Sequence, residues 1–335
     1  MIAYGKCGIM IKFGICIPQD GLAYERIKKI ALRSEELGFN SIWLFDHLHS
    51  FPQPDKDPFF ECWTTLSALA EATTQLRLGS LVLNAQYRNP ALLAKMAATL
   101  DNISNGRLEF GIGAGGTVRA EWSEKLGYTA EYRAYGMDFL EKPSARIRKL
   151  EEAIQIIKKL WSEDKVTFEG KYYTVKNAFC YPKPVQKPHP PIWIGGMGEK
   201  LMLKVMAKLA DGCNFAWSLS PEEYAKKLSI LNEYCKIFGR PISSIRKSFL
   251  TACVLGDSPK EVRRILRDIA KDYNNIKGYV PYALRKGALI GTTEECARKI
   301  SEFEEVGVNY FMLVFPLRHI ERSIEKFART IMPSF

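Results

Sequence analysis

Short apolar runs alternate with longer stretches of helical periodicity along nearly the whole chain. Runs of strand length cover residues 11–18, 41–47, 76–84, 107–113, 191–196, 211–217, 247–255 and 309–315. Stretches of helical length separate them, at residues 23–37, 59–73, 90–103, 143–161, 200–210, 221–238, 259–273 and 293–306. An open doubly wound sheet usually has fewer strands and a nucleotide-binding motif after the first one. The alternation therefore predicts an α/β fold, a single (β/α)8 TIM barrel.

The barrel is predicted to use residues 1–335 as one domain. Residues 1–9 are expected to form a disordered extension, and residues 317–335 a C-terminal helix. Two segments are too long to be simple loops: residues 115–140 follow the fourth strand, and residues 274–290 precede the last barrel helix. Because long ordered loops at the carboxyl side of barrel strands often bind ligands, both insertions are expected to border a site.

Local signals fix three further features. Asn89 and Ser220 each precede a proline, which predicts capped helices that begin at residues 90 and 221. Residues 166–175 have the pattern of a hairpin, with its turn at a Glu-Gly pair. None of these features needs a catalytic explanation.

Composition narrows the class of protein. Of the 335 residues, 47% are hydrophobic and 25% are charged, which is enough for a large core. No apolar run approaches the roughly 18 residues that span a bilayer, and the first residues lack the apolar centre of a signal peptide, so a soluble cytoplasmic protein is expected. Eight cysteines without a CxxC pair and four histidines without metal-type spacing predict neither a disulfide framework nor a metal site.

The formal net charge of +11 raises the question of nucleic-acid binding. The basic residues are spread over predicted helix faces, and acidic residues lie among them, so a solvated surface explains them. A nucleic-acid interface rests on charge alone and would show steep salt dependence. Attraction of anionic small molecules is a milder consequence of the same charge.

The second predicted strand ends in an acid and an imidazole, Asp46 and His47. Ionisable groups at the carboxyl end of a buried parallel strand lie at the mouth of the barrel, where α/β enzymes place their chemistry. The ordinary pKa of histidine, about 6.5, suits proton transfer near neutrality. A structural histidine in an apolar neighbourhood is the alternative interpretation.

Glycines follow two other strands. The first group runs from Gly111 to Gly116, and the second comprises Gly195, Gly196 and Gly198. Bare backbone lets a ligand approach closely and presents N–H donors to oxygen atoms, and a helix N-terminus adds its dipole at the second group. A tight structural turn explains either group alone, whereas two such corners on one barrel favour an anionic cofactor.

Taken together, these segments resemble the bacterial luciferase-like superfamily, and most closely its coenzyme F420-dependent branch. The resemblance is carried by Asp46-His47, by Leu81-Val-Leu-Asn84 leading to Tyr87-Arg-Asn-Pro90, by Gly106-Arg107, by Gly111-Ile-Gly-Ala-Gly115, by Ala130-Glu-Tyr-Arg-Ala-Tyr-Gly136, by Phe168-Glu-Gly-Lys-Tyr-Tyr173 and by Pro191-Ile-Trp-Ile-Gly-Gly196. It covers residues 11–316.

The resemblance implies a deazaflavin or flavin across the carboxyl mouth of the barrel. It implies a non-prolyl cis peptide at Leu81-Val82 or one residue later, and a role for His47 in assisting the substrate. The cofactor contacts that it implies are Asp46, Leu81, Val82, Asn84, Gly113, Ala114, Gly115, Gly195, Gly196, Met197 and Gly198. It also implies a homodimer, since relatives are commonly dimers.

The sequence departs from the sugar-phosphate dehydrogenases of this branch. These enzymes resemble the chain but place a glutamate after the glycine loop, where Gly116 stands here, and the chain carries extra residues before Ala130. This departure disfavours sugar-phosphate oxidation. We predict a coenzyme F420-dependent oxidoreductase that moves hydride between deazaflavin C5 and a small organic substrate. The alternatives are an FMN-dependent luciferase-like monooxygenase and a barrel that binds an anionic ligand without turnover.

Overall fold

The computed structural model describes residues 10–50, 55–116, 129–272 and 286–335. The predicted extension at residues 1–9 lies outside this part of the chain. So do portions of both predicted insertions, at 115–140 and 274–290.

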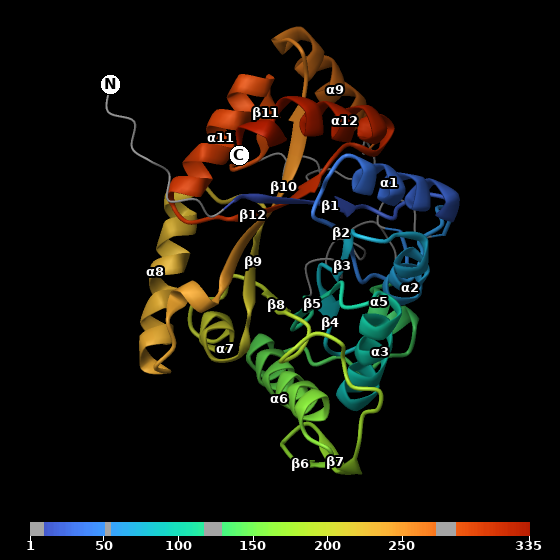
Figure 1. Ribbon diagram of the computed structural model, residues 1–335, viewed down its shortest axis with the longest axis vertical. Helices are drawn as coiled ribbons and strands as arrows, with labels where there is room; N and C mark the ends of the chain where they lie inside the picture. Colours follow the sequence, from blue (N-terminus) through green and yellow to red (C-terminus); the bar gives the residue numbers. More distant parts are fainter. Residues whose placement is uncertain (1–9, 51–54, 117–128, 273–285) are drawn as a thin grey trace.

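The main sheet is a closed parallel barrel (Figure 1). Its strands are β1 (Lys12–Ile17), β2 (Ser41–Leu44), β3 (Arg77–Ser80), β4 (Leu83–Asn84), β5 (Leu108–Gly113), β8 (Ile192–Gly195), β9 (Gly212–Ala216), β10 (Arg246–Leu255) and β12 (Tyr310–Val314). The circle closes because β12 pairs in parallel with both β10 and β1. A short strand, β11 (Leu289–Gly291), pairs with β10 outside the circle. The predicted (β/α)8 barrel is confirmed.

The third predicted strand is interrupted. β3 ends at Ser80, β4 begins at Leu83, and the Leu81-Val82 peptide between them is cis. β3 pairs with β2 on one side and β5 on the other, while β4 pairs only with β5, near the carboxyl end of that strand. The cis peptide that the resemblance implied is therefore confirmed at the first of its two expected positions.

Helices cover the outside of the barrel. They are α1 (Tyr24–Glu36), α2 (Cys62–Ala72), α3 (Pro90–Ile103), α6 (Pro143–Ser162), α7 (Met202–Leu209), α8 (Pro221–Ile237), α9 (Pro259–Asp272), α11 (Thr293–Glu305) and α12 (Ile320–Thr330). The short helix α5 (Glu131–Ala134) lies instead at the carboxyl mouth of the barrel. The predicted caps are confirmed: the side chain of Asn89 accepts hydrogen bonds from backbone N–H groups in the first turn of α3, and Ser220 forms a capping box with Glu223. None of the described helices combines the length and apolar character needed to cross a bilayer.

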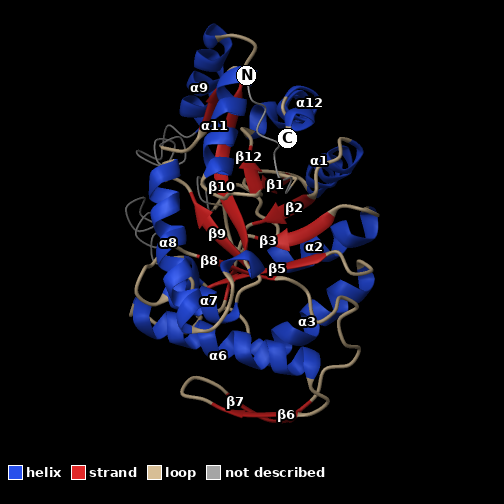
Figure 2. Cartoon of the chain, turned by 60° about the vertical axis from the view of Figure 1, so that its left-hand side comes forward, coloured by secondary structure: helices blue, strands red, loops and turns tan. Residues whose placement is uncertain are grey.

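The predicted hairpin is also confirmed. It consists of β6 (Val166–Glu169) and β7 (Thr174–Ala178), which pair antiparallel outside the barrel. Figure 2 shows the hairpin beyond α6, at the edge of the molecule. Glu152 of α6 holds its turn by accepting hydrogen bonds from the backbone of residues 171–173.

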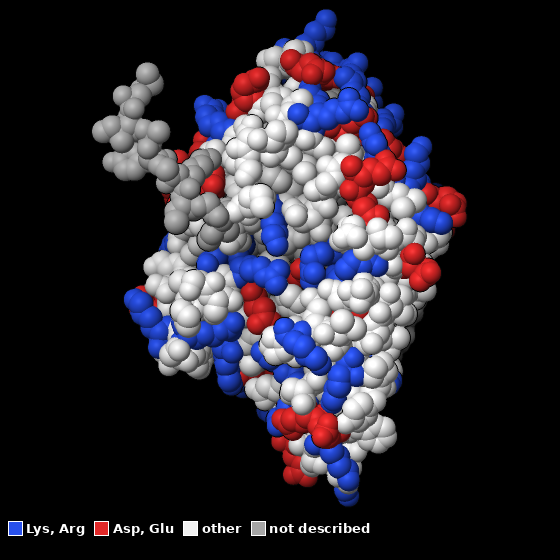
Figure 3. Space-filling model, viewed as in Figure 1, with Lys and Arg blue, Asp and Glu red and all other residues white. Residues whose placement is uncertain are grey.

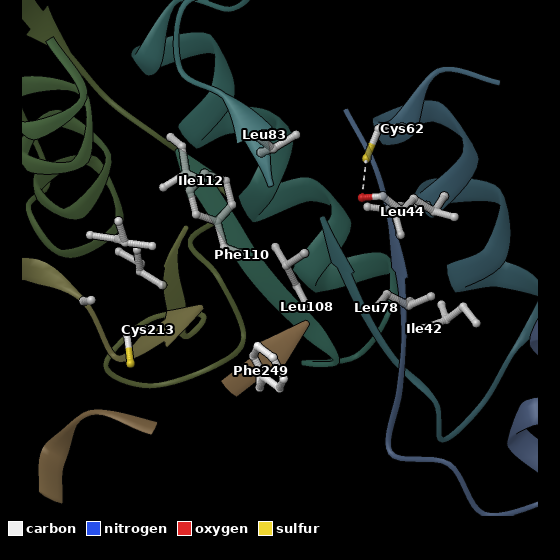
Figure 4. Packing of buried hydrophobic residues seen from close by; sticks show 14 of the residues in the cluster. Ile42, Leu44, Cys62, Leu78, Leu83, Leu108, Phe110, Ile112, Cys213 and Phe249 are labelled. Carbon is white, nitrogen blue, oxygen red and sulfur yellow. Dashed lines mark hydrogen bonds between the residues drawn. The ribbon is translucent and has the colours of Figure 1, made fainter. Parts of the chain in front are cut away.

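Two apolar layers stabilise the barrel. The outer layer lies between strands and helices, and Figure 4 shows part of it, where Ile42, Leu78 and Leu108 of three neighbouring strands lie side by side. The inner layer fills the barrel itself: the rings of Trp43 and Trp193 meet edge to face with centroids 5.8 Å apart, and Tyr310 packs against both. The barrel interior is therefore a packed core rather than a channel.

An ionic cluster closes the amino-terminal end of the barrel. The carboxylate of Glu109 is fully buried, and it pairs with Arg77 and, at 3.3 Å, with Arg246. Trp193 donates its indole N–H to the same carboxylate at 2.5 Å. Because Arg77 and Arg246 begin their strands, the cluster lies at the end of the barrel opposite the strand tips.

The charged surface agrees with the interleaving seen in the sequence. Basic and acidic side chains are intermixed over the face shown in Figure 3. Lys208 of α7 pairs with Glu151 of α6 at 2.7 Å, and Lys227 of α8 pairs with Glu199 of the turn before α7 at 2.6 Å, so part of this surface consists of ion pairs.

Candidate active site

A cavity of about 320 Å³ opens at the carboxyl ends of the strands. It is lined by Asp46, His47, Leu81, Val82, Leu83, Asn84, Tyr87, Gly113, Ala114, Gly115, Gly116, Glu131, Tyr132, Gly195, Gly196 and Met202. Small-molecule sites typically measure about 300–1,000 Å³, and barrel enzymes use this end of the fold. The structure thus brings together His47 and all but two of the predicted cofactor contacts; Met197 and Gly198 are not among the lining residues.

Val82 explains why two of the lining glycines lack side chains. A Cβ placed on Gly113 would lie 2.8 Å from Val82 Cγ2, and one on Gly195 would lie 2.9 Å from the same atom. A Cβ on Gly111 would collide with the carbonyl oxygen of Ser80. These glycines make room for the β3–β4 connection, so packing within the chain is one reason for their bare backbone.

Gly115 and Gly196 are bare for a second reason. Their φ angles are +73° and +139°, backbone conformations that residues with a side chain rarely adopt. A Cβ on Gly115 would also lie 2.5 Å from Oδ1 of Asn84, and one on Gly196 would lie 3.0 Å from Met202 Cγ. Both positions are tight turns at the pocket wall, so turn geometry and pocket shape depend on the same residues.

Asp46 lines the pocket, but its carboxylate oxygens are already engaged. The carboxylate is fully buried; Arg88 donates to Oδ2 at 2.8 Å and to Oδ1 at 2.9 Å, and the Asn84 backbone N–H donates to Oδ2 at 2.8 Å. Burial alone would lower the pKa of Arg88, but hydrogen bonds and charge from Asp46 and Glu61 outweigh it and raise this pKa above its ordinary value. The geometry of Asp46 therefore fits a residue that positions β4 at the pocket.

His47 has a partner that the sequence did not indicate. Its Nδ1 lies 2.9 Å from Oε2 of Glu131, a carboxylate that is 6% exposed, while His47 itself is 27% exposed. Glu131 also accepts hydrogen bonds from the Leu48 backbone N–H at 2.9 Å and from the Tyr87 hydroxyl at 3.2 Å. The segment 130–136 contributed to the family resemblance, but nothing in the local sequence linked Glu131 to His47.

Arg146, in the first turn of α6, donates a hydrogen bond to the loop that contains Gly115. Its Nε donates to the Gly115 carbonyl at 3.2 Å, and its Nη1 donates to the carbonyls of Leu140 at 3.0 Å and Glu141 at 2.6 Å. The residue is 5% exposed, and burial lowers the pKa of its guanidinium. Arg146 was also missed in the sequence, because its acceptors are backbone carbonyls that leave no residue signature.

The pocket has an aromatic wall and carboxylates but few cations. Tyr132 stacks on Phe139, with ring centroids 4.1 Å apart and planes inclined by 13°. Among the described lining residues there is no lysine or arginine. The described part of the chain also contains no group of three or more His, Cys, Asp or Glu side chains that could hold a metal ion. The arrangement suits a planar organic ligand held by apolar contacts and backbone donors.

A closed parallel barrel with one such pocket at its carboxyl mouth defines the class of TIM-barrel proteins that bind a small molecule at their strand tips. Within this class, residues 7–283 match the luciferase-like monooxygenase family, and the chain belongs to that family.

Three similar proteins illustrate its range. The chain is 31% identical over 226 residues to a protein of Microbacterium testaceum named F420-dependent glucose-6-phosphate dehydrogenase, which covers 66% of this chain and 61% of that protein. It is 26% identical over 365 residues to the FMNH(2)-dependent dimethylsulfone monooxygenase of Pseudomonas putida, covering 96% of this chain and 94% of that one. A solved F420-dependent secondary alcohol dehydrogenase in complex with an F420-acetone adduct has the same fold, with a TM-score of 0.79 at 22% identity over 96% of this chain and 98% of that one.

The matched part spans about three fifths of the length of the F420-dependent glucose-6-phosphate dehydrogenases. The family and the fold expected from the sequence are confirmed. These relatives use either F420 or FMN, so the coarser expectation of a redox cofactor agrees with the family, and the choice between the two cofactors belongs to the proposal that follows.

Proposed function

We propose that the protein is a coenzyme F420-dependent oxidoreductase that moves hydride between deazaflavin C5 and a small organic substrate. The observation that carries the proposal is the convergence of His47 with the glycine corners of β5 and β8 on one pocket. The names of the F420-dependent relatives support the cofactor.

The residues present fit a planar tricyclic ring, and the backbone at two glycine corners would meet the oxygen atoms of its tail. Leu81 and Val82 offer an apolar surface between the backbones of β5 and β8. The loop at Gly113, Ala114 and Gly115 and the corner at Gly195 and Gly196 offer backbone close to the ligand. In this assignment Asn84, Met197 and Gly198 complete the cofactor contacts, and Asp46 contributes by holding β4.

When bound, the cofactor supplies the hydride chemistry, and the protein supplies binding and proton transfer. In the oxidation of an alcohol, His47 would accept the hydroxyl proton. In the reduction of a carbonyl, His47 would return a proton to the carbonyl oxygen. His47 has the position for this role, because it lies three residues after β2 at the pocket wall.

Fluorescence titration of the purified protein with F420 and with FMN tests the proposal. We expect saturable binding of F420 that weakens strongly in Gly115→Ala, because the new Cβ meets Asn84 at a φ of +73°. Gly239→Ala is the matched control, since it also replaces a glycine with positive φ but lies after α8 in open space. Tight FMN binding without F420 affinity would overturn the proposal.

An FMN-dependent monooxygenase is the second candidate. One observation favours it: the match to the FMNH(2)-dependent dimethylsulfone monooxygenase runs over 96% of the chain, whereas matches to the F420-dependent dehydrogenases cover 61 to 66%. The same titration separates the two by cofactor affinity, and oxygen consumption in the presence of reduced FMN would identify the monooxygenase.

We also propose that the protein acts as a cytoplasmic homodimer on small molecules, without nucleic acid. Exposed apolar side chains support self-association: Leu92 and Ile103 on α3 are 57% and 48% exposed, and Phe179 and Tyr181 are 71% and 51% exposed. These segments are adjacent, because Asn102 donates to the Lys183 carbonyl at 2.8 Å. Light scattering of the eluted protein should give twice the chain mass of 38.1 kDa, and a monomer at micromolar concentration would contradict the proposal.

A further inference from the structure

Glu131 binds the segment that follows β2 at two points. Its Oε2 lies 2.9 Å from His47 Nδ1, and its Oε1 accepts a 2.9 Å hydrogen bond from the backbone N–H of Leu48. The residue begins α5, a four-residue helix that follows β5 in the chain. A carboxylate from a distant segment therefore fixes both the ring of His47 and the backbone beside it.

Tyr87 adds a third contact to the same carboxylate. Its hydroxyl lies 3.2 Å from Oε2, and burial together with the charge of Glu131 raises the pKa of Tyr87 above its ordinary value. The phenol consequently keeps its proton and donates it in a hydrogen bond. An ionised carboxylate can only accept, and opposite an ionised Glu131 the Nδ1 of His47 would be the donor.

The position of this proton decides what His47 can do. A neutral imidazole carries one N–H, and when Nδ1 holds it, Nε2 has a free lone pair. Within the described residues the hydrogen bond of His47 is the one at Nδ1. Because the ring is 27% exposed and lines the pocket, Nε2 is the atom left for a ligand.

We propose that Glu131 is a positioning residue that holds neutral His47 as the Nδ1–H tautomer, with the lone pair of Nε2 available to the pocket. The consequence for catalysis rests on the proposed function: Nε2 accepts a hydroxyl proton from an alcohol or returns it to a carbonyl oxygen. The tautomer itself is a property of the chain without any ligand. Asp46, the neighbouring carboxylate, does not compete for this role, since it is paired with Arg88.

Nitrogen NMR of the ligand-free, full-length protein tests the assignment. With ¹⁵N-labelled histidine there are four imidazoles, and His47→Gln identifies the resonances of His47. The spectra above neutral pH report which ring nitrogen carries the proton. Glu131→Gln keeps the size of the side chain and removes its charge, and Glu131→Asp keeps the charge. Glu163→Gln, which replaces an exposed carboxylate paired with Lys159 at the end of α6, is the matched control.

We expect His47 to be protonated mainly on Nδ1 in the wild type and in Glu163→Gln. In Glu131→Gln the ratio of Nδ1–H to Nε2–H should fall by roughly tenfold or more, because a charge-assisted hydrogen bond is lost. Glu131→Asp should restore part of the ratio. A wild-type His47 protonated on Nε2, or a folded Glu131→Gln with an unchanged ratio, would overturn the assignment.

The experiment stays decisive if Glu131→Gln does not fold, because the wild-type spectrum and Glu131→Asp still report the tautomer. It is also separable from the proposed function. If F420 fails to bind while the tautomer depends on Glu131, the proposed function falls and the positioning role stands. If F420 is bound and turned over while the tautomer does not depend on Glu131, the proposed function stands and the positioning role falls.

Discussion

Replacing Gly195 with alanine tests whether the β3–β4 connection depends on bare backbone in β8. The new Cβ would lie 2.9 Å and 3.1 Å from the two methyl carbons of Val82. Carbon atoms pack best at about 3.5–4.0 Å, so Val82 or β8 must move by roughly half an ångström or more.

The expected cost follows from this displacement. Inserting a carbon into a packed site costs about 1–3 kcal/mol of folding stability. Because Val82 is half-buried at the pocket, its side chain can move, and we expect a loss of about 1–2 kcal/mol. For 335 residues the entropy of unfolding is about 0.7 kcal/mol/K, so Tm should fall by about 1.5–3 °C. Scanning calorimetry resolves such a shift.

Two further variants make the test specific. Gly198→Ala lies in the same β8–α7 turn, but its Cβ would be an ordinary 3.5 Å from Met202 Cβ, so Tm should stay within about 0.5 °C. In a Val82→Ala background the clashing methyl groups are gone, and Gly195→Ala should cost at least about 1 kcal/mol less than in the wild type. Additivity of the two substitutions within about 0.5 kcal/mol would refute the packing argument.

Three other predictions concern single side chains. His47→Gln should lower turnover with F420 by about 10²–10⁴-fold and leave F420 affinity nearly unchanged; unaltered turnover would show that His47 transfers no proton in the reaction. Burial acts to raise the pKa of Glu61, but backbone N–H donors in the first turn of α2 outweigh it and lower this pKa, so the stabilisation is complete above about pH 4.3 and is lost as the pH falls through the lower folded-state value. Glu61→Gln should therefore lose less stability than the wild type between pH 5 and pH 3 in urea unfolding, and parallel losses would contradict this. Glu109→Gln should destabilise by about 1–3 kcal/mol at neutral pH in the same assay, because Arg77 and Arg246 lose their shared counter-charge but remain partly solvated, and an unchanged urea midpoint would show that the cluster contributes nothing.

The alternation of apolar and periodic segments was sufficient to predict the barrel. Each of the eight apolar runs became a barrel strand, because a strand buried on both faces needs a continuous apolar run. The break inside residues 76–84 left no trace in that pattern, since peptide isomer and local bulge do not alter hydrophobic periodicity. The family resemblance supplied it, and the cis Leu81-Val82 peptide agrees.

The site was less accessible to sequence reasoning because its contacts join distant residues. His47 and Glu131 are 84 positions apart, and Asp46 and Arg88 are 42 apart. The pocket location followed from strand ends, whereas the partners of each side chain depend on how loops fold back over them. The glycines show the opposite error: Gly195 was visible in the sequence, but its packing against Val82 was not.

The sealed amino-terminal end has a kinetic consequence. Trp43, Trp193 and Tyr310 fill the interior of the described barrel, and Glu109 with its arginine partners covers the far side. Ligands must then enter and leave the pocket through the carboxyl mouth of the barrel. Two molecules stacked in a dead-end chamber depart in the reverse of their order of arrival, so steady-state kinetics should follow an ordered sequence in which the deeper occupant enters first and leaves last.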